Sequence, residues 1–268
     1  MSMKVITKSK NEAGFTYCEK PIPADLKPNE VLIKVKSVSV CGTDVHIYEW
    51  DQWSQNRIKP PLTVGHEFSG EVVKLGSEVK LVKIGDLVSS ESHIICGVCE
   101  YCLSGNGHIC PNTKVIGVDV DGCFAEYLKI PEENLFIDKS GLDPIYLSVF
   151  EPLGNAVHAV RHFDIKNKDV VIIGAGPIGL MGIDVARASG ARQIIVTEIN
   201  EYRINLAKEL GADYVLNPTK EDVVSKIRSF TNGEGCDVAV DFSGSIVAIN
   251  QALDYLKPNG ALSILGVF

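Results

Sequence analysis

The sequence predicts an α/β protein with two domains, a β-rich domain at residues 1–152 and a doubly wound domain at residues 153–268. Two observations lead to this prediction. Before residue 150 the chain has short β-rich runs separated by turns, and no long amphipathic helix is evident. After about residue 165, short apolar runs alternate with segments of helical length, which is typical of parallel strands covered on both faces.

The first half contains four candidate strands. They are EVLIKVKSVSV (30–40), GEVVKLG (70–76), GDLVSSES (85–92) and CFAEYLKI (123–130). We therefore expect a compact, loop-rich β domain, and the segment EPLGNAV (151–157) is the expected passage to the second half.

The second half contains five candidate strands, DVVIIG, QIIVTE, DYVLN, CDVAVDF and ALSILGVF. Helices are expected between them at about 177–189, 201–210, 221–230 and 246–256. This alternation predicts a doubly wound sheet in which five strands are visible.

Composition limits the partners of the chain. The 268 residues, 45% of them hydrophobic, suffice to bury a substantial core. A net charge of −8 has the wrong sign for nucleic-acid binding, so we expect a small-molecule partner. The charged N-terminus has no signal-peptide core, and the longest apolar run, 170–183, is shorter than the roughly 20 residues that span a bilayer. We expect a cytoplasmic protein that does not enter a membrane.

GAGPIG provides Gly174, Gly176 and Gly179 between a strand and a helix, which is the setting of a dinucleotide-binding turn. Glu198, at the end of the next strand, can accept hydrogen bonds from ribose hydroxyls and repel a 2′-phosphate, which favours NAD over NADP. Arg203 could stack on adenine, reach toward a phosphate or lie in solvent. A purely structural glycine turn is the alternative.

Four cysteines, Cys96, Cys99, Cys102 and Cys110, lie within fifteen residues. Disulfides are the least expected state in a reducing compartment. Four thiolates close the coordination of a tetrahedral zinc, so we expect a structural zinc, with an iron–sulfur cluster as the alternative. Further upstream, Cys41, His66 and Glu67 offer sulfur, nitrogen and oxygen, a set that leaves zinc an open position for chemistry. Taken singly, each of these three has an ordinary structural explanation, and spacing alone leaves the choice open.

GHEFSGEVVKLGSEVKLVKIGDLV, the four-cysteine loop and GAGPIG, in this order, resemble the zinc-dependent medium-chain alcohol dehydrogenases over essentially the whole chain. CGTDVHIYEWDQWSQ, ESHIICG, GCFAEYL and EPLGNAVHAV are similar to the branch of this family that oxidises L-threonine. The resemblance implies a GroES-like catalytic domain followed by a Rossmann NAD-binding domain.

The resemblance also implies roles for single residues. Cys41, His66 and Glu67 match the surroundings of the catalytic zinc, and Glu151 matches an acidic position near the metal that assists proton movement, with direct ligation left open. The remaining matches fall into three groups. They are Thr43 and His46 in a proton relay that includes the nicotinamide ribose, His93 beside the substrate pocket, and Ile178, Leu265, Gly266 and Val267 against the cofactor. His93 could instead be an ordinary polar residue at a strand end.

The implied reaction is zinc- and NAD-dependent oxidation of the secondary hydroxyl of L-threonine to 2-amino-3-oxobutanoate. A polyol or diol dehydrogenase of the same family is the alternative, as is a chain that binds zinc and NAD with little turnover. Members of the family are homo-oligomers, commonly tetramers. They continue through a sixth strand and return to the catalytic domain, so we expect a chain ending at Phe268 to lack part of the pocket and of the oligomer interface.

Overall fold

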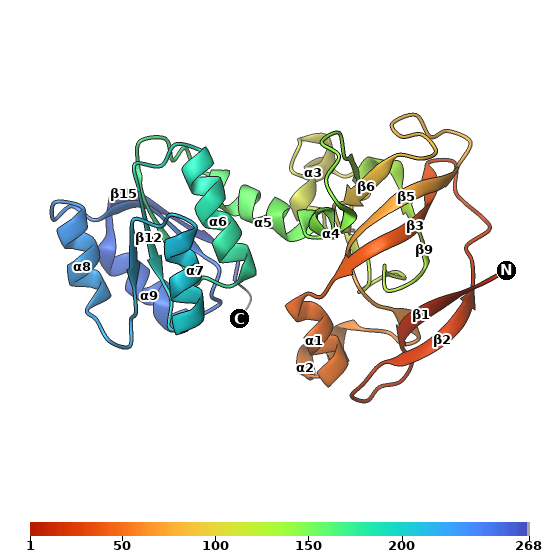
Figure 1. Cartoon of the computed structure of the whole chain (residues 1–268), viewed down its shortest axis with the longest axis horizontal. Helices are drawn as coiled ribbons and strands as arrows, with labels where there is room; N and C mark the ends of the chain where they lie inside the picture. The colour runs from red at the N-terminus through yellow and green to blue at the C-terminus, as the bar shows by residue number, and fades with distance from the viewer. Residues whose placement is uncertain (267–268) are drawn as a thin grey trace. The chain divides into compact units, whose positions relative to one another are not determined.

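The computed structural model describes residues 1–266, which form two compact units that divide between Glu151 and Pro152 (Figure 1). The segment 151–157 lies within one helix, α5 (Phe150–Arg161), and the division between the units falls near the start of this helix. Among the described residues, no helix is long and apolar enough to cross a membrane.

Unit 1 contains three sheets, of which the five-stranded one is called the large sheet below. A five-stranded antiparallel sheet has the order β10 (Leu135–Ile137), β6 (Leu87–Ser90), β5 (Glu67–Leu75), β3 (Glu30–Ser39) and β9 (Tyr127–Pro131). A second sheet has the order β2 (Thr16–Pro21), β1 (Ser2–Lys8) and β4 (Leu62–Thr63), and β7 (His93–Ile94) pairs with β8 (Lys114–Val115). The four strands expected from the sequence are thus present as β3, β5, β6 and β9.

The first two strands were not predicted. Along β1, Met3, Val5 and Thr7 are buried and alternate with exposed residues, which is the period of a strand with one face on the core. Only two of these three buried residues are apolar, so the pattern is weak in the sequence alone.

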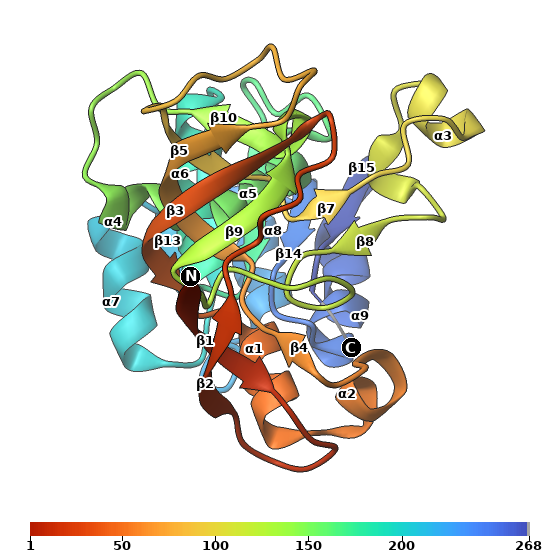
Figure 2. The ribbon, with the colours of Figure 1, turned by 90° about the vertical axis from the view of Figure 1, so that its right-hand side faces the viewer.

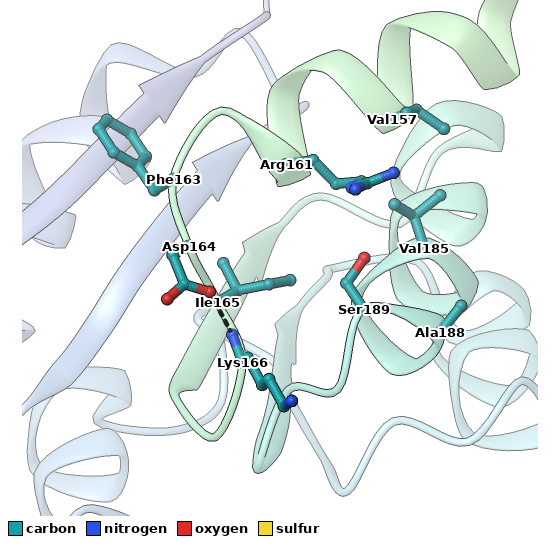
Figure 3. A pocket seen from close by; sticks show the side chains of 9 residues that line it. All are labelled: Val157, Arg161, Phe163, Asp164, Ile165, Lys166, Val185, Ala188 and Ser189. Carbon is teal, nitrogen blue, oxygen red and sulfur yellow. Dashed lines mark hydrogen bonds between the residues drawn. The ribbon is translucent and has the colours of Figure 1, made fainter.

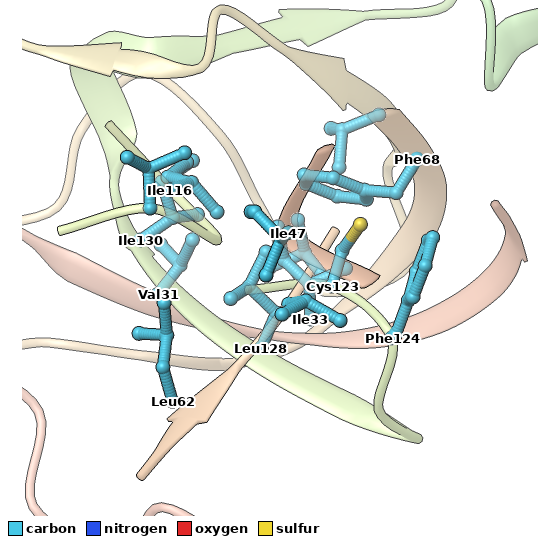
Figure 4. Packing of buried hydrophobic residues seen from close by; sticks show 14 of the residues in the cluster. Val31, Ile33, Ile47, Leu62, Phe68, Ile116, Cys123, Phe124, Leu128 and Ile130 are labelled. Carbon is cyan, nitrogen blue, oxygen red and sulfur yellow. The ribbon is translucent and has the colours of Figure 1, made fainter. Parts of the chain in front are cut away.

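The core of unit 1 anchors the helix that carries Thr43 and His46 and that begins directly after Cys41. Ile33, Phe68 and Leu128, from three strands of the large sheet, pack around Ile47 (Figure 4). Ile47 lies in α1 (Gly42–Glu49) and is fully buried. The other short helices of this unit are α2 (Gln52–Arg57), α3 (Glu100–Leu103), α4 (Pro144–Leu147) and the 3₁₀ turns η1 (Gly107–Ile109) and η2 (Glu132–Asn134). In Figure 2 the segment with α3, drawn in yellow, projects from the large sheet.

Unit 2 is a parallel sheet, as the sequence predicts. Its order is β13 (Tyr214–Leu216), β12 (Gln193–Thr197), β11 (Asp169–Ile173), β14 (Cys236–Asp241) and β15 (Leu256–Ile264). The helices are α6 (Pro177–Ala188), α7 (Glu201–Glu209), α8 (Val223–Phe230) and α9 (Ile246–Tyr255). The strand order reverses at β11, the place where doubly wound sheets bind ligands.

Burial of β11 on both faces explains its continuous apolar sequence. Val170 and Ile172 belong to a core with Ile183 of α6, whereas Val171 and Ile173 belong to a separate core with Ile227 of α8. All five residues of the strand are buried. The helices therefore cover both sides of the sheet and leave its carboxyl edge for the glycine turn.

Candidate functional site

Cys41 lies at the N-terminus of α1, immediately after β3. The carboxylate of Asp44 accepts the backbone N–H of Cys41 at 2.9 Å, and Asp44 is itself buried. An acid at the third helical position that caps the preceding backbone fixes the start of the helix. Asp44 thereby holds Cys41 in place. Our reading of the sequence missed this residue, although its spacing from Cys41 was a usable signal.

His66 and Glu67 reach the same place through strand pairing. Glu67 opens β5 and pairs with Ser39, two residues before Cys41. The preceding Gly65 has φ +89°, and a Cβ there would lie 2.2 Å from the ring of Phe124, so only glycine fits this turn. Both His66 and Glu67 are buried.

Cys41, His66 and Glu67 form a compact donor set. One ligand atom from each lies within 4.8 Å of the others. Among the described residues, Nδ1 of His66 is buried and has no hydrogen-bond partner. Burial raises the pKa of the Cys41 thiol. Burial also raises the pKa of Glu67, to about 7; the nearby Glu151 and Asp44 carboxylates add to this shift, and His66 opposes it. A bound divalent cation would favour the charged forms of both, so the residues fit a zinc ion.

Replacing Glu67 by glutamine should stabilise the metal-free chain at neutral pH. A carboxyl whose folded pKa is about 7, against 4.5 ordinarily, holds its proton more tightly when folded. Its contribution to stability is therefore full below pH 4.5 and is lost as the pH rises through 7. Denaturant unfolding of the metal-free proteins should show Glu67→Gln and wild type nearly equal at about pH 4, and the variant about 3 kcal/mol more stable above about pH 8.

Zinc should reverse this order, because glutamine is a poorer ligand than a carboxylate. A metal-free wild type that is the more stable protein at neutral pH would contradict the burial argument.

Glu151 lies at the beginning of α5, is buried, and accepts a hydrogen bond from Ser92 Oγ at 2.6 Å. Its charge acts both on Glu67 and on His93. His93, which opens β7, is exposed, and its Nδ1 lies 2.5 Å from Glu91 Oε1. This hydrogen bond raises the pKa of His93; burial opposes the ionisation of Glu91, but the hydrogen bonds from His93 outweigh it and lower the pKa of Glu91. Glu91 and Ser92 were not among the predicted residues.

The two residues expected in the proton relay lie on α1. Thr43 Oγ1 is 3.7 Å from Cys41 Sγ. His46, one turn further, is exposed, and its Nδ1 lies 2.6 Å from Asp51. Their spacing of three residues places them on one side of the helix, with His46 toward solvent.

The four-cysteine cluster has the dimensions of a metal site. The Sγ atoms of Cys99 and Cys102 are 3.5 Å apart, and the other measured pairs among the four are 3.6 to 3.9 Å apart. Zinc with bonds of about 2.3 Å to four sulfurs gives tetrahedral edges of about 3.8 Å. Disulfide sulfurs would lie only about 2.05 Å apart, and all four cysteines are free. Backbone N–H donors lower the pKa of Cys96 to about 6, which favours a thiolate there.

The glycine turn between β11 and α6 has the geometry that the sequence predicts. Gly174 has φ +88°, and a Cβ on Gly179 would lie 2.0 Å from the carbonyl oxygen of Gly174. A Cβ on Gly176 would meet no atom within 4 Å, so the space over this residue is open for a ligand. The first and third glycines thus shape the turn, and the second borders the free space at the helix N-terminus.

Glu198 supports this turn directly. One carboxylate oxygen accepts the N–H of Ala175 at 2.8 Å, and the other accepts the N–H groups of Ile199 and Asn200. A carboxylate has about four acceptor positions, so one remains for a ribose hydroxyl. The structure therefore adds a structural task to the binding task expected from the sequence.

A cavity of about 330 Å³ lies over the glycine turn. Its lining includes Gly174, Gly176, Glu198 and Arg203 of the expected residues. It also includes residues that the sequence analysis did not select, among them Pro218, Phe242, Ser243 and Ser245. Several of these follow the carboxyl ends of β13 and β14, where a doubly wound sheet binds its ligand, which was the available signal.

The other described residues expected to contact the cofactor do not line this cavity. Ile178 and Leu265 are partly buried against the core of unit 2. The N–H groups of Leu265 and Gly266 bond to the carbonyl of Asp241 at the end of β14. Val267 lies outside the described residues.

A larger cavity of about 640 Å³ lies elsewhere in unit 2 (Figure 3). It is bounded by Val157 and Arg161 of α5, Ile165 and Lys166 before β11, and Val185 of α6. None of the candidate site residues lines it, so size does not identify the functional site in this protein.

Comparisons with known proteins agree with this arrangement. Residues 27–139 match the alcohol dehydrogenase GroES-like domain, and residues 177–268 match the zinc-binding dehydrogenase family. The chain is 52% identical to an L-threonine 3-dehydrogenase of Caldanaerobacter subterraneus subsp. tengcongensis, over 99% of this chain and 76% of that protein.

Solved structures are also similar. A zinc-binding dehydrogenase of Sinorhizobium meliloti 1021 bound to NADP has a TM-score of 0.91 at 32% identity, covering 100% of this chain and 78% of that one. An alcohol dehydrogenase of Escherichia coli CFT073 complexed with NADH has a TM-score of 0.90 at 28% identity, covering 100% and 77%. On the two domain matches and the identity to its relatives, the chain belongs to the zinc-dependent medium-chain alcohol dehydrogenase family.

Proposed function

We propose that this chain oxidises the secondary hydroxyl of L-threonine to 2-amino-3-oxobutanoate, with one catalytic zinc, one structural zinc and NAD. The cluster of Cys41, His66 and Glu67 carries the proposal, in a chain 52% identical to an L-threonine 3-dehydrogenase. In this proposal residues 1–152 form the catalytic domain and residues 153–268 bind the dinucleotide.

Cys41, His66 and Glu67 would hold the catalytic zinc, and Cys96, Cys99, Cys102 and Cys110 the structural one. When bound, the catalytic zinc acts as a Lewis acid that lowers the pKa of the substrate hydroxyl. The four-sulfur site has no open position and holds the projecting segment of unit 1 in place.

Proton transfer is assigned to residues of α1. Thr43, whose Oγ1 lies 3.7 Å from Cys41 Sγ, would accept the hydroxyl proton of the alcohol. His46 is exposed and bonds through Nδ1 to Asp51, so its other ring nitrogen can pass a proton to water. Glu151 adds a buried carboxylate close to Glu67 that assists this transfer.

Cofactor binding is assigned to the glycine turn and its surroundings. Gly174, Gly176 and Gly179 would receive the pyrophosphate, and Glu198 the adenosine ribose, with Arg203 at the edge of the same cavity. Ile178, Leu265, Gly266 and Val267 are proposed to support the nicotinamide end. NAD, when bound, would supply the acceptor for the hydride of the carbinol carbon. Because the Glu198 carboxylate would repel a 2′-phosphate, NAD should be preferred to NADP.

A substrate panel tests the proposal. The zinc-loaded chain should reduce NAD with L-threonine and do so much more slowly with sorbitol, xylitol or 2,3-butanediol. NADP should give at least about tenfold lower kcat/KM, which corresponds to one unpaired or repelled charge contact. Faster turnover of a polyol or diol would assign the chain to that alternative. Two bound zinc ions without turnover of any alcohol would make it a zinc- and NAD-binding chain.

A further inference from the structure

The tripeptide Glu91-Ser92-His93 is held rigidly beside the candidate active site. The side-chain amide of Asn134 donates to the carbonyls of both Glu91 and His93, at 2.9 and 3.0 Å. The N–H of Glu91 donates to the carbonyl of Asn134 at 2.8 Å. Asn134 is buried, so these three hydrogen bonds fix the backbone on which the two titratable side chains stand.

Within this tripeptide the carboxylate of Glu91 makes two hydrogen bonds with His93. The same oxygen, Oε1, accepts the backbone N–H of His93 at 2.9 Å and lies 2.5 Å from Nδ1 of its ring. An ionised carboxylate only accepts hydrogen bonds, so Nδ1 carries a proton and Nε2 is the atom left for another partner.

Ser92 connects the tripeptide to Glu151, and its Oγ also lies 3.3 Å from Nδ1 of His93, farther than the 2.5 Å that separates Nδ1 from Glu91. Its hydroxyl donates to Glu151 at 2.6 Å, and Glu91, His93 and Glu151 bring one ligand atom each within 4.8 Å of one another. Glu151 also acts electrostatically on Glu67 of the zinc cluster. The tripeptide therefore borders the place where the alcohol reacts.

The charges at this border are mostly negative. Glu67, Glu91 and Glu151 all carry carboxyl groups. Of the two histidines nearby, His66 belongs to the zinc cluster with Cys41, and His93 does not. A substrate carboxylate entering this acidic surrounding needs an N–H donor, and His93 is the side chain of these clusters that can offer one.

We propose that Glu91 is a positioning residue that fixes the His93 ring with Nδ1 toward itself and Nε2 toward the substrate, where Nε2–H donates to the carboxylate of a β-hydroxy acid. This inference rests on the proposed function and deepens it, because it names the group that separates L-threonine from diols and polyols. Glu91 itself does not touch the substrate.

Three ligands that differ by one group test this inference in the zinc-loaded chain. L-threonine carries both charged groups, 3-hydroxybutyrate lacks the ammonium group, and 1-amino-2-propanol lacks the carboxylate. Calorimetric titration should show the two carboxylates binding about tenfold more tightly than 1-amino-2-propanol, the gain from about one charge-assisted hydrogen bond.

Variants of Glu91 should then remove this preference. Glu91→Leu should weaken both carboxylates about tenfold and leave 1-amino-2-propanol within about twofold, and Glu91→Gln, which keeps an acceptor, should be intermediate. The same two substitutions at Glu78, an exposed residue of unit 1, should change nothing. Long-range ¹H–¹⁵N spectra should show a protonated Nδ1 of His93 in wild type and a loss of that state in Glu91→Leu.

Two results would overturn the inference: equal weakening of all three ligands by Glu91→Leu, which marks a merely structural role, or binding of 1-amino-2-propanol as tight as that of L-threonine. The proposed function fails separately, if the chain oxidises a diol or no alcohol while the carboxylate preference persists.

Discussion

Replacing Cys99 by serine should remove one zinc ion and loosen the segment between β7 and β8. The four Sγ atoms lie 3.5 to 3.9 Å apart in the measured pairs, and the substitution removes one of them. Without the metal, the three remaining thiolates would repel one another. Structural zinc sites stabilise small domains by on the order of 10 kcal/mol, so the local effect should be large. Limited proteolysis should cleave this segment in the variant and spare it in wild type, and thermal unfolding should begin at a lower temperature.

Cys18→Ser is the matched control, because Cys18 is a free cysteine of β2 that belongs to neither metal cluster. It should leave zinc content, cleavage pattern and unfolding temperature unchanged. A Cys99→Ser protein that keeps its zinc and resists cleavage would show that these sulfurs do not hold the segment together.

Replacing His66 by alanine should give a folded protein that cannot turn over. His66 brings its imidazole to the cluster with Cys41 and Glu67, and its buried Nδ1 has no other partner among the described residues. A Lewis-acid metal contributes several kcal/mol to the transition state, so kcat/KM for the alcohol should fall about a thousandfold or more. Zinc content should drop by one ion, and the unfolding temperature should change little.

His162→Ala provides the comparison, because His162 is an exposed histidine of unit 2 outside both clusters. It should keep full activity and both zinc ions. If His66→Ala unfolded the chain and Cys99→Ser merely abolished turnover, the division into a catalytic and a structural metal site would be wrong.

The fold was predictable where the pattern is local and strong. The unbroken apolar run of β11 followed by GAGPIG predicted a strand, a tight turn and a helix, and the structure has all three. The N-terminal strands were missed, because β1 buries a threonine and a lysine beside its two buried apolar residues and leaves the apolar Ile6 exposed. Strand β5 begins at Glu67, earlier than the expected residue 70, since the polar residues Glu67 and Ser69 are buried within it.

The candidate site residues also differ in whether their cluster is local in the sequence or assembled by the fold. The four cysteines are close in sequence, so their spacing alone predicted a compact metal site. The second cluster depends on the pairing of Ser39 with Glu67 across two strands, which spacing does not reveal. The donor types of its three residues suggested a zinc site but left the choice open, and the family resemblance then favoured it. Ser92 and Glu151 are 59 residues apart and meet through one hydrogen bond, so neither Ser92 nor Glu91 could be recognised before the structure placed them.

Zinc content measured by plasma mass spectrometry tests the central claim, that this chain has two metal sites with separate tasks. The wild-type chain should contain two zinc ions per molecule, and Cys41→Ser should contain one and lose turnover while remaining folded. A wild-type chain with a single zinc ion that Cys41→Ser retains would leave only the four-cysteine site and would contradict the assignment of Cys41, His66 and Glu67 to catalysis.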